Sequence, residues 1–224
     1  MNAPALRTAP VVIFDLDGTL IDSAPAIHRV SNLVLADFDL PPLDADTVRS
    51  FVGKGTPNLV RQLLEASGKD PEGAIFDEVH DRLVARYEKE VEGNTLYPGV
   101  VTALEALTEA GFRLGICTNK PYRPAEAALH HVGLFDTFEA LLGGDSLATR
   151  KPDPAMLHHV HRQLGGGPML YVGDSEVDAE TAVNARAPFA LYTEGYRKTP
   201  VADLPHHATF SDYAALPGIA ERFQ

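Results

Sequence analysis

The sequence predicts an α/β protein in which a doubly wound parallel sheet carries a helical insert after its first strand. Two observations predict this fold. From residue 97 onward, short apolar runs typical of strands alternate with helical segments of about 10 to 15 residues, the pattern of right-handed βαβ crossovers. Before that point, residues 24–91 show helical periodicity without a convincing strand.

The first strand is the apolar run Val11–Phe14, which stops abruptly at Asp15 and Asp17. An apolar run of this length suits a central strand of a parallel sheet, because both faces of such a sheet are covered. Side chains alternate along an extended chain, so Asp15 and Asp17 are expected to point the same way while Leu16 points into the fold. Ligands of such sheets collect at the carboxyl ends of the strands, which is where this pair lies.

Two carboxylates this close repel each other unless a cation or a proton intervenes. A hard divalent ion with oxygen ligands is the natural partner, and Mg²⁺ is the ion that we expect. The plainer interpretation is that one Asp caps a helix or starts an Asx turn, the common use of a lone Asp before Gly. Matching groups at other strand ends decide between the two.

The insert is predicted to contain amphipathic helices at Ala24–Phe38 and Asp77–Val91. Between them, a further helix is expected after Gly53-Lys54-Gly55, with Thr56 as its N-cap and Pro57 in its first turn. The apolar stripe of this helix consists of Leu59, Leu63 and Leu64.

The remainder of the chain alternates between helix and strand. Glycine ends the first of these helices at Gly111, as is common at helix C-termini. The expected elements are a helix at Val100–Ala110, a strand at Arg113–Thr118, a helix at Pro121–Val132, a strand near Glu139–Leu142, a helix at Pro154–Leu164, a strand at Met169–Gly173, a helix at Ser175–Arg186 and a strand at Pro188–Tyr192.

Composition limits the class of protein and its partners. The 224 residues are 45% hydrophobic, which is enough for one good core and a smaller appendage. The formal net charge of -12 makes nucleic acid and anionic membrane poor partners. No segment approaches a membrane-spanning length and residues 1–10 lack a secretory apolar run, so we expect a cytoplasmic protein. The single cysteine, Cys117, lies in an apolar run and is expected to be a buried hydrophobe rather than a nucleophile.

Polar residues follow two later strands where the opening strand has its acidic pair. Thr118 and Asn119 stand at the start of a helix, whose free N–H groups and positive dipole end suit a phosphate oxygen. Asp174 lies at a strand tip and Asp178 one helical turn later, so both can face one ion. Helix capping, with an ordinary first-turn acid, is the alternative for each pair.

A lysine, Lys151, stands between a loop and a helix. Because Pro152 biases it toward an extended backbone, its side chain can be aimed at a ligand, although a solvated side chain is the usual fate of an isolated lysine. In order, the chain carries Asp-x-Asp-Gly-Thr, Thr-Asn, Lys-Pro and Gly-Asp-x-x-x-Asp, each at an expected strand end. This set resembles the haloacid dehalogenase-like hydrolase superfamily over essentially the whole chain. The resemblance implies a Rossmann-like core of residues 1–22 and 95–224 and an inserted α-helical cap domain of residues 23–94.

The resemblance also implies phosphoryl transfer through an aspartyl phosphate. Asp15 would be the nucleophile and Asp17 the acid that protonates the leaving alcohol. Asp17 excludes a dehalogenase, because haloacid dehalogenases lack this acid. Mg²⁺ would bind Asp15, Asp174 and the Asp17 main-chain carbonyl, while Asp178 would orient this shell. The groups that would hold the phosphate oxygens are Lys151, Thr118 and the amides around Gly18 and Asn119.

Residues of the insert indicate which phosphate ester is the substrate. Gly53-Lys54-Gly55, followed by Leu59 and Arg61, is similar to the cap of phosphoglycolate phosphatases, and Thr193–Lys198 is similar to bacterial members of that group. The resemblance implies hydrolysis of 2-phosphoglycolate to glycolate and phosphate, with Lys54 or Arg61 anchoring the substrate carboxylate. Thr56-Pro57 departs from the Leu-Pro common in that group, and a solvated loop cation is the alternative for Lys54.

Other functions remain open at this point. A pyrophosphatase, a sugar-phosphate phosphatase or a β-phosphoglucomutase would share the same core motifs. A non-catalytic phosphate-sensing module is an alternative of a different class, but such modules are about half this length and do not need Asp17. We expect a small phosphorylated metabolite as the partner and a monomer or homodimer as the working form.

Overall fold

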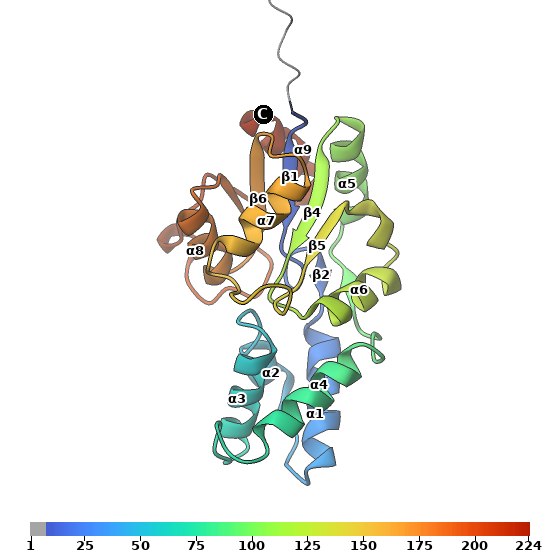
Figure 1. The fold of residues 1–224 in the computed structure, drawn as a ribbon, viewed down its shortest axis with the longest axis vertical. Coiled ribbons are helices and arrows are strands. Elements are labelled where there is room, and N and C mark those ends of the chain that lie inside the picture. The colour runs from blue at the N-terminus through green and yellow to red at the C-terminus, as the bar shows by residue number, and fades with distance from the viewer. Residues whose placement is uncertain (1–7) are drawn as a thin grey trace, which may run out of the picture.

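The computed structural model describes residues 8–224 and consists of an α/β core with a helical cap below it in Figure 1. The core sheet has six parallel strands in the order β5-β4-β1-β6-β7-β8. The strands are β1 (Val11–Phe14), β4 (Arg113–Cys117), β5 (Ala140–Leu142), β6 (Met169–Gly173), β7 (Phe189–Tyr192) and β8 (Ala208–Phe210). The predicted doubly wound parallel sheet is therefore confirmed.

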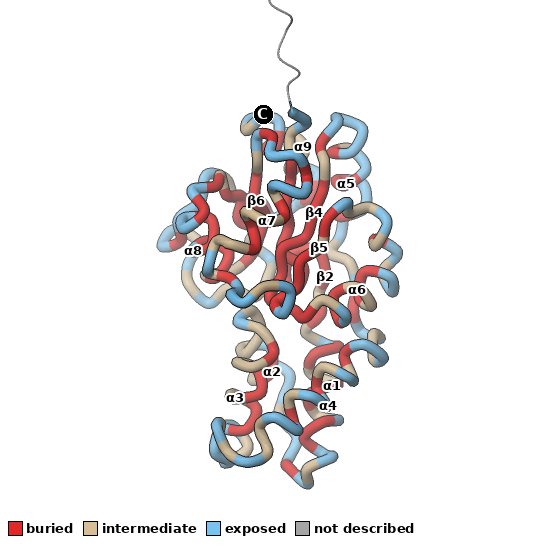
Figure 2. Tube along the Cα trace, viewed as in Figure 1, coloured by how far each residue is buried: buried red, intermediate tan, exposed pale blue. Residues whose placement is uncertain are grey.

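Strand β1 lies in the middle of the sheet and is fully buried, as its apolar sequence predicts. Alternation sends its side chains to opposite faces. Val12 and Phe14 pack in a cluster with α5, α6 and α9, whereas Val11 and Ile13 pack in a second cluster with α7 and α8. Figure 2 shows the strands buried between these two layers. These helices are α5 (Val100–Glu109), α6 (Tyr122–His131), α7 (Ala155–Gln163), α8 (Glu176–Ala185) and α9 (Leu216–Ala220).

The cap consists of four helices with an apolar cluster of their own, in which Val30, Leu63 and Leu83 are fully buried. The chain enters and leaves the cap through a short antiparallel ribbon, β2 (Ile21–Asp22) with β3 (Thr95–Leu96). The cap helices are α1 (Ala24–Asp37), α2 (Ala45–Arg49), α3 (Thr56–Ala66) and α4 (Phe76–Tyr87).

Most helix ends lie within one residue of the sequence prediction, and the start of α3 and the end of α4 differ in a way that has a physical reason. Helix α3 takes Gly55 as its N-cap residue, because the expected cap, Thr56, is already inside the helix and its hydroxyl pairs with the His80 ring at 3.1 Å. Helix α4 ends at Tyr87 rather than Val91. Glu88, Glu90 and Glu92 follow this end, and acidic side chains oppose the negative end of the helix dipole.

The sequence analysis expected no secretory apolar run in residues 1–10. Most of this segment, residues 1–7, lies outside the described residues. Within residues 8–224, none of the helices has the length and apolar character needed to cross a membrane.

Candidate active site

The sheet brings the predicted site residues together at its carboxyl edge. Asp15 follows β1, Thr118 follows β4 and Asp174 follows β6, while Lys151 lies in the loop after β5. All four are buried. They meet because β4, β1 and β6 are adjacent parallel strands, so their carboxyl ends share one edge.

Three buried carboxylates converge at this edge. Asp15, Asp174 and Asp178 each offer an oxygen that lies within 4.8 Å of those of the other two. Burial, together with the charge of Asp178, raises the pKa of Asp15 to about 7. Burial, together with the charges of Asp178 and Asp15, raises the pKa of Asp174 well above its ordinary value. These acids therefore need a cation to be charged together. A set of hard carboxylate oxygens is what Mg²⁺ prefers, so the residues present fit the predicted ion.

Lys151 supplies one buried positive charge beside these acids. Its Nζ lies 2.8 Å from Asp15 Oδ1 and 2.7 Å from Asp178 Oδ1, and it donates to the Tyr171 hydroxyl at 3.1 Å. Burial opposes the ammonium, but Asp15 and Asp178 outweigh it and raise the pKa of Lys151. The lysine is thus held charged against the predicted nucleophile.

Asp178 is engaged by the chain through both of its oxygens. Oδ1 accepts from Lys151 and from the Tyr171 hydroxyl at 2.6 Å, while Oδ2 accepts from the Ser175 hydroxyl, also at 2.6 Å. Burial works against its charge, but Lys151 and these hydroxyls hold the pKa of Asp178 below its ordinary value. This arrangement suits a residue that orients Lys151 and the Asp174 loop rather than one that binds a ligand itself.

The carboxylate of Asp174 is fixed from two sides. Oδ1 accepts from the Thr19 hydroxyl at 2.9 Å, and Oδ2 accepts from the Tyr196 amide at 2.6 Å. Gly18 has a φ of +87°, and a Cβ added there would lie 2.6 Å from Asp174 Oδ2. Glycine is required at this position both for its conformation and for the close approach of the carboxylate.

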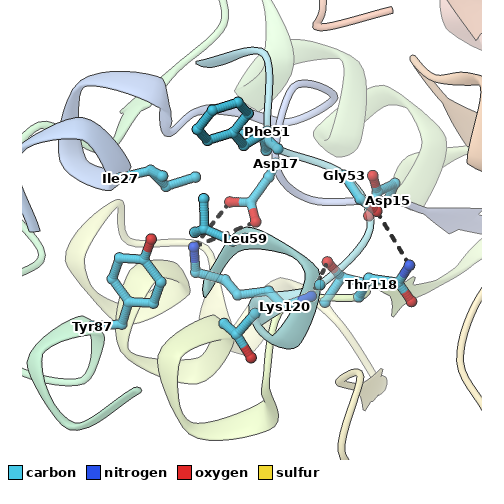
Figure 3. A pocket seen from close by; sticks show the side chains of 13 residues that line it. Asp15, Asp17, Ile27, Phe51, Gly53, Leu59, Tyr87, Thr118 and Lys120 are labelled. Atoms are coloured by element: carbon cyan, nitrogen blue, oxygen red, sulfur yellow. Dashed lines mark hydrogen bonds and ion pairs between the residues drawn. The ribbon is translucent and has the colours of Figure 1, made fainter. Parts of the chain in front are cut away.

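Asp17 pairs with a lysine that the sequence analysis did not single out. The Lys120 Nζ lies 3.1 Å from Asp17 Oδ1 and 5.2 Å from the centre of the Tyr87 ring on α4. Figure 3 shows the ammonium between Asp17 and Tyr87. The only signal in the sequence was the position of Lys120 directly after Thr-Asn, where a lysine is expected to be solvated.

Thr118 and Asn119 support the loops around Asp15. The Thr118 hydroxyl accepts from the Lys120 amide at 3.2 Å. The Asn119 side-chain amide donates to the Lys151 carbonyl at 3.0 Å and to the Gly53 carbonyl at 3.2 Å. Asn119 therefore links the cap loop to the lysine loop, a role that its sequence position did not predict.

The comparisons with known proteins agree with this geometry. The profile of a hydrolase family, haloacid dehalogenase-like hydrolase, matches residues 9–186. The chain belongs to this family. It is 61% identical to a phosphoglycolate phosphatase of Rhodobacter capsulatus, over 95% of this chain and 97% of the relative. It is 46% identical to a phosphoglycolate phosphatase of Cereibacter sphaeroides (strain ATCC 17025), over 94% of this chain and 97% of the relative.

Solved structures in the same family share the fold. A predicted phosphoglycolate phosphatase from Haemophilus somnus 129PT superposes with a TM-score of 0.87 at 30% identity, covering 96% of this chain and 99% of that one. The family resemblance stated from the motifs is confirmed, as is the α/β core with its cap.

Two cavities open beside Asp15 and Asp17 at the junction of this core and cap. The smaller, about 40 Å³, is lined by Thr118 and Lys120 from the core, and the larger, about 230 Å³, is lined by Lys54. Lys54 is exposed at its position on the cap loop. Arg61 lines neither cavity: it pairs with Glu72, and its guanidinium lies over the Phe76 ring. The structure thus brings together all the predicted core residues, places Lys54 at the rim and leaves Arg61 on the cap.

Proposed function

We propose that this protein is a cytoplasmic, Mg²⁺-dependent phosphatase that hydrolyses 2-phosphoglycolate to glycolate and phosphate through an aspartyl phosphate on Asp15. The observation that carries the chemistry is the buried Asp15 carboxylate, which lies 2.8 Å from Lys151 Nζ at the edge of a cavity that also contains Asp17. The naming of the 61% identical relative as a phosphoglycolate phosphatase supports the choice of substrate.

The first half-reaction transfers the phosphoryl group to Asp15. A carboxylate oxygen of Asp15 forms a bond to phosphorus, the bond from phosphorus to the ester oxygen breaks, and Asp17 gives that oxygen a proton, which releases glycolate. Lys151 fixes one oxygen of Asp15 and places positive charge beside the transferred group.

The second half-reaction returns the enzyme to its starting state. Asp17, now a carboxylate, takes a proton from a water molecule that attacks phosphorus, and the bond from phosphorus to the Asp15 oxygen breaks to release phosphate. Mg²⁺, held by Asp15, Asp174 and the Asp17 main-chain carbonyl, would neutralise charge on the phosphoryl oxygens. Asp178 keeps Lys151 and the Asp174 loop in place throughout.

The substrate carries a carboxylate in addition to its phosphate, and this second anion needs a cation of its own. Lys54 is a candidate, because it lines the larger cavity with Asp15 and Asp17. Arg61 is a weaker candidate, since its guanidinium already forms an ion pair with Glu72.

The test is phosphate release across a panel of substrates in Mg²⁺. The panel contains 2-phosphoglycolate, pyrophosphate, glucose phosphates and nucleotides. We expect kcat/KM to be highest for 2-phosphoglycolate and activity to stop in EDTA and return with Mg²⁺. Preference for pyrophosphate or a sugar phosphate would refute the substrate while keeping the phosphatase. A single stable phosphorylation without turnover would indicate a phosphate-sensing module, and a requirement for a bisphosphate would indicate a mutase.

A further inference from the structure

We propose that Lys120 binds the carboxylate of the substrate and thereby sets the preference for a phosphate ester of a small acid. The inference rests on the proposed function, because it names the group that recognises the second anion of the same substrate. It replaces Lys54 and Arg61 in that role with a residue from the core.

The position of Lys120 follows from that of Asp17. Its Nζ lies 3.1 Å and 3.3 Å from the two Asp17 oxygens. Asp17 is the group that protonates the ester oxygen in the proposed reaction, so this oxygen must lie within hydrogen-bonding reach of it. In 2-phosphoglycolate a single methylene group separates the ester oxygen from the carboxylate. The carboxylate of a bound substrate is therefore brought close to whatever adjoins Asp17, and the adjoining cation is Lys120.

The cavity around Lys120 suits a small acid. Apolar side chains of the cap, among them Ile27, Phe51 and Leu59, form much of its wall (Figure 3). Its volume is about 40 Å³, and a water-sized group needs about 10–15 Å³, so the space beside Lys120 holds a few small groups such as a carboxylate. Of the described residues that line it, Lys120 alone is basic. Asp15 and Asp17 line the same cavity and repel an anion, so Lys120 is the lining side chain whose charge can hold one there, and the apolar wall strengthens that attraction.

Lys120 keeps capacity for a ligand. An ammonium group has three donors, and the partner that Lys120 Nζ has among the described side chains is the Asp17 carboxylate. The Tyr87 ring of α4 lies against this ammonium, with its centre 5.2 Å from Nζ. A third donor of Lys120 is therefore open to an anion in the cavity.

The two cap cations predicted for this role, Lys54 and Arg61, are less suited to it. Lys54 is exposed, so solvent weakens its attraction for an anion, whereas the Lys120 side chain is only 6% exposed. Arg61 is paired with Glu72 outside both cavities.

The test compares two small phosphate esters, of which only one carries a carboxylate. One is 2-phosphoglycolate and the other is ethyl phosphate, which has the same alkyl ester but no acid. Lys120→Met and Lys120→Gln should lower the ratio of kcat/KM for 2-phosphoglycolate to that for ethyl phosphate by about 10- to 100-fold, mainly through KM, as expected for a lost charge-assisted contact. Lys54→Met is the competing variant, and Lys69→Met, an exposed cap lysine, is the charge-matched control.

The ratio of the two kcat/KM values is insensitive to effects that act through Asp17, because these lower kcat/KM for both substrates alike. An equal loss for both substrates in Lys120→Met would overturn the proposal, as would loss of preference in Lys54→Met alone. If neither neutral variant folds, Lys120→Arg keeps the charge, and its bulkier head in this small cavity should raise KM for 2-phosphoglycolate more than for ethyl phosphate. An unchanged ratio in a folded Lys120→Arg protein would then overturn it. Failure of the proposed function looks different, because the wild-type protein itself would then show no preference for 2-phosphoglycolate.

Discussion

The Tyr196 hydroxyl accepts a hydrogen bond from the backbone amide of Ala24, the first residue of α1, at 2.9 Å. It also accepts from the Ser23 amide at 2.8 Å and donates to Asp22 at 2.7 Å, while the Tyr196 amide donates to Asp174. One residue thus ties the predicted metal ligand to the point where the chain enters the cap.

Tyr196→Phe should destabilise the protein by about 1–3 kcal/mol, because it leaves two amides at the start of α1 without their acceptor. Urea unfolding measures this change in the free energy of unfolding. The matched control is Tyr122→Phe. The Tyr122 hydroxyl makes a long hydrogen bond of 3.4 Å to Glu126, so this substitution should cost less than about 0.5 kcal/mol. Equal effects of the two substitutions would show that the Tyr196 hydroxyl does not hold the cap entrance.

Lys151→Met should lower the free energy of unfolding by about 3–5 kcal/mol, because it leaves the buried Asp15 and Asp178 without their shared cation. The same urea experiment measures it. Lys69→Met removes an exposed lysine and should change stability by no more than about 0.5 kcal/mol. A Lys151→Met protein as stable as this control would mean that the buried charges are not coupled as the distances indicate.

Mg²⁺ should raise the unfolding temperature of metal-free protein by about 5–10 °C at a hundredfold excess over its Kd, because it binds only the folded acids. The experiment is thermal unfolding with and without the ion. Asp174→Asn should abolish the shift, whereas Asp81→Asn, at an exposed acid of the cap, should keep it. A shift that survives in Asp174→Asn would place the ion elsewhere.

Asp17→Asn should lower the first-turnover rate for 2-phosphoglycolate by about 10²- to 10⁴-fold, because the alkoxide then leaves without a proton. The first-turnover release of nitrophenolate from p-nitrophenyl phosphate should fall far less, since this leaving group does not need protonation. Rapid-quench and stopped-flow measurements give the two rates. If both rates fell by the same factor, Asp17 would not be the proton donor.

The sequence predicted the core well because its strands are apolar runs that end at polar residues. Both β1 and β6 lie where the pattern placed them. Strand β8, by contrast, was missed, because its three residues run from half-buried Ala208 through exposed Thr209 to buried Phe210 and offer no apolar run. The two-residue strands β2 and β3 are too short for any periodicity to reveal.

The sequence could predict which site residues lie together where strand order determines their positions. It could not do so where the positions depend on packing between distant segments. Asp15, Asp174 and Lys151 meet because their strands end at one edge of the sheet. The contact of Lys120 with Tyr87 depends on how α4 packs near the start of α6, and no local pattern encodes this. Cys117 is buried as expected, and burial raises the pKa of its thiol to about 12, which removes it as a nucleophile.

The central claim is that Asp15 accepts the phosphoryl group, and direct detection of the acyl phosphate tests it. Folded Asp17→Asn protein is mixed with acetyl phosphate, whose acetate leaves without a proton, so the intermediate forms but breaks down slowly for lack of a base. After an acid quench, peptide mass spectrometry should find one phosphoryl group on Asp15 and none in the Asp15→Asn/Asp17→Asn double variant. A phosphoryl group on another residue, or phosphate release by folded Asp15→Asn protein at the wild-type rate, would contradict the account.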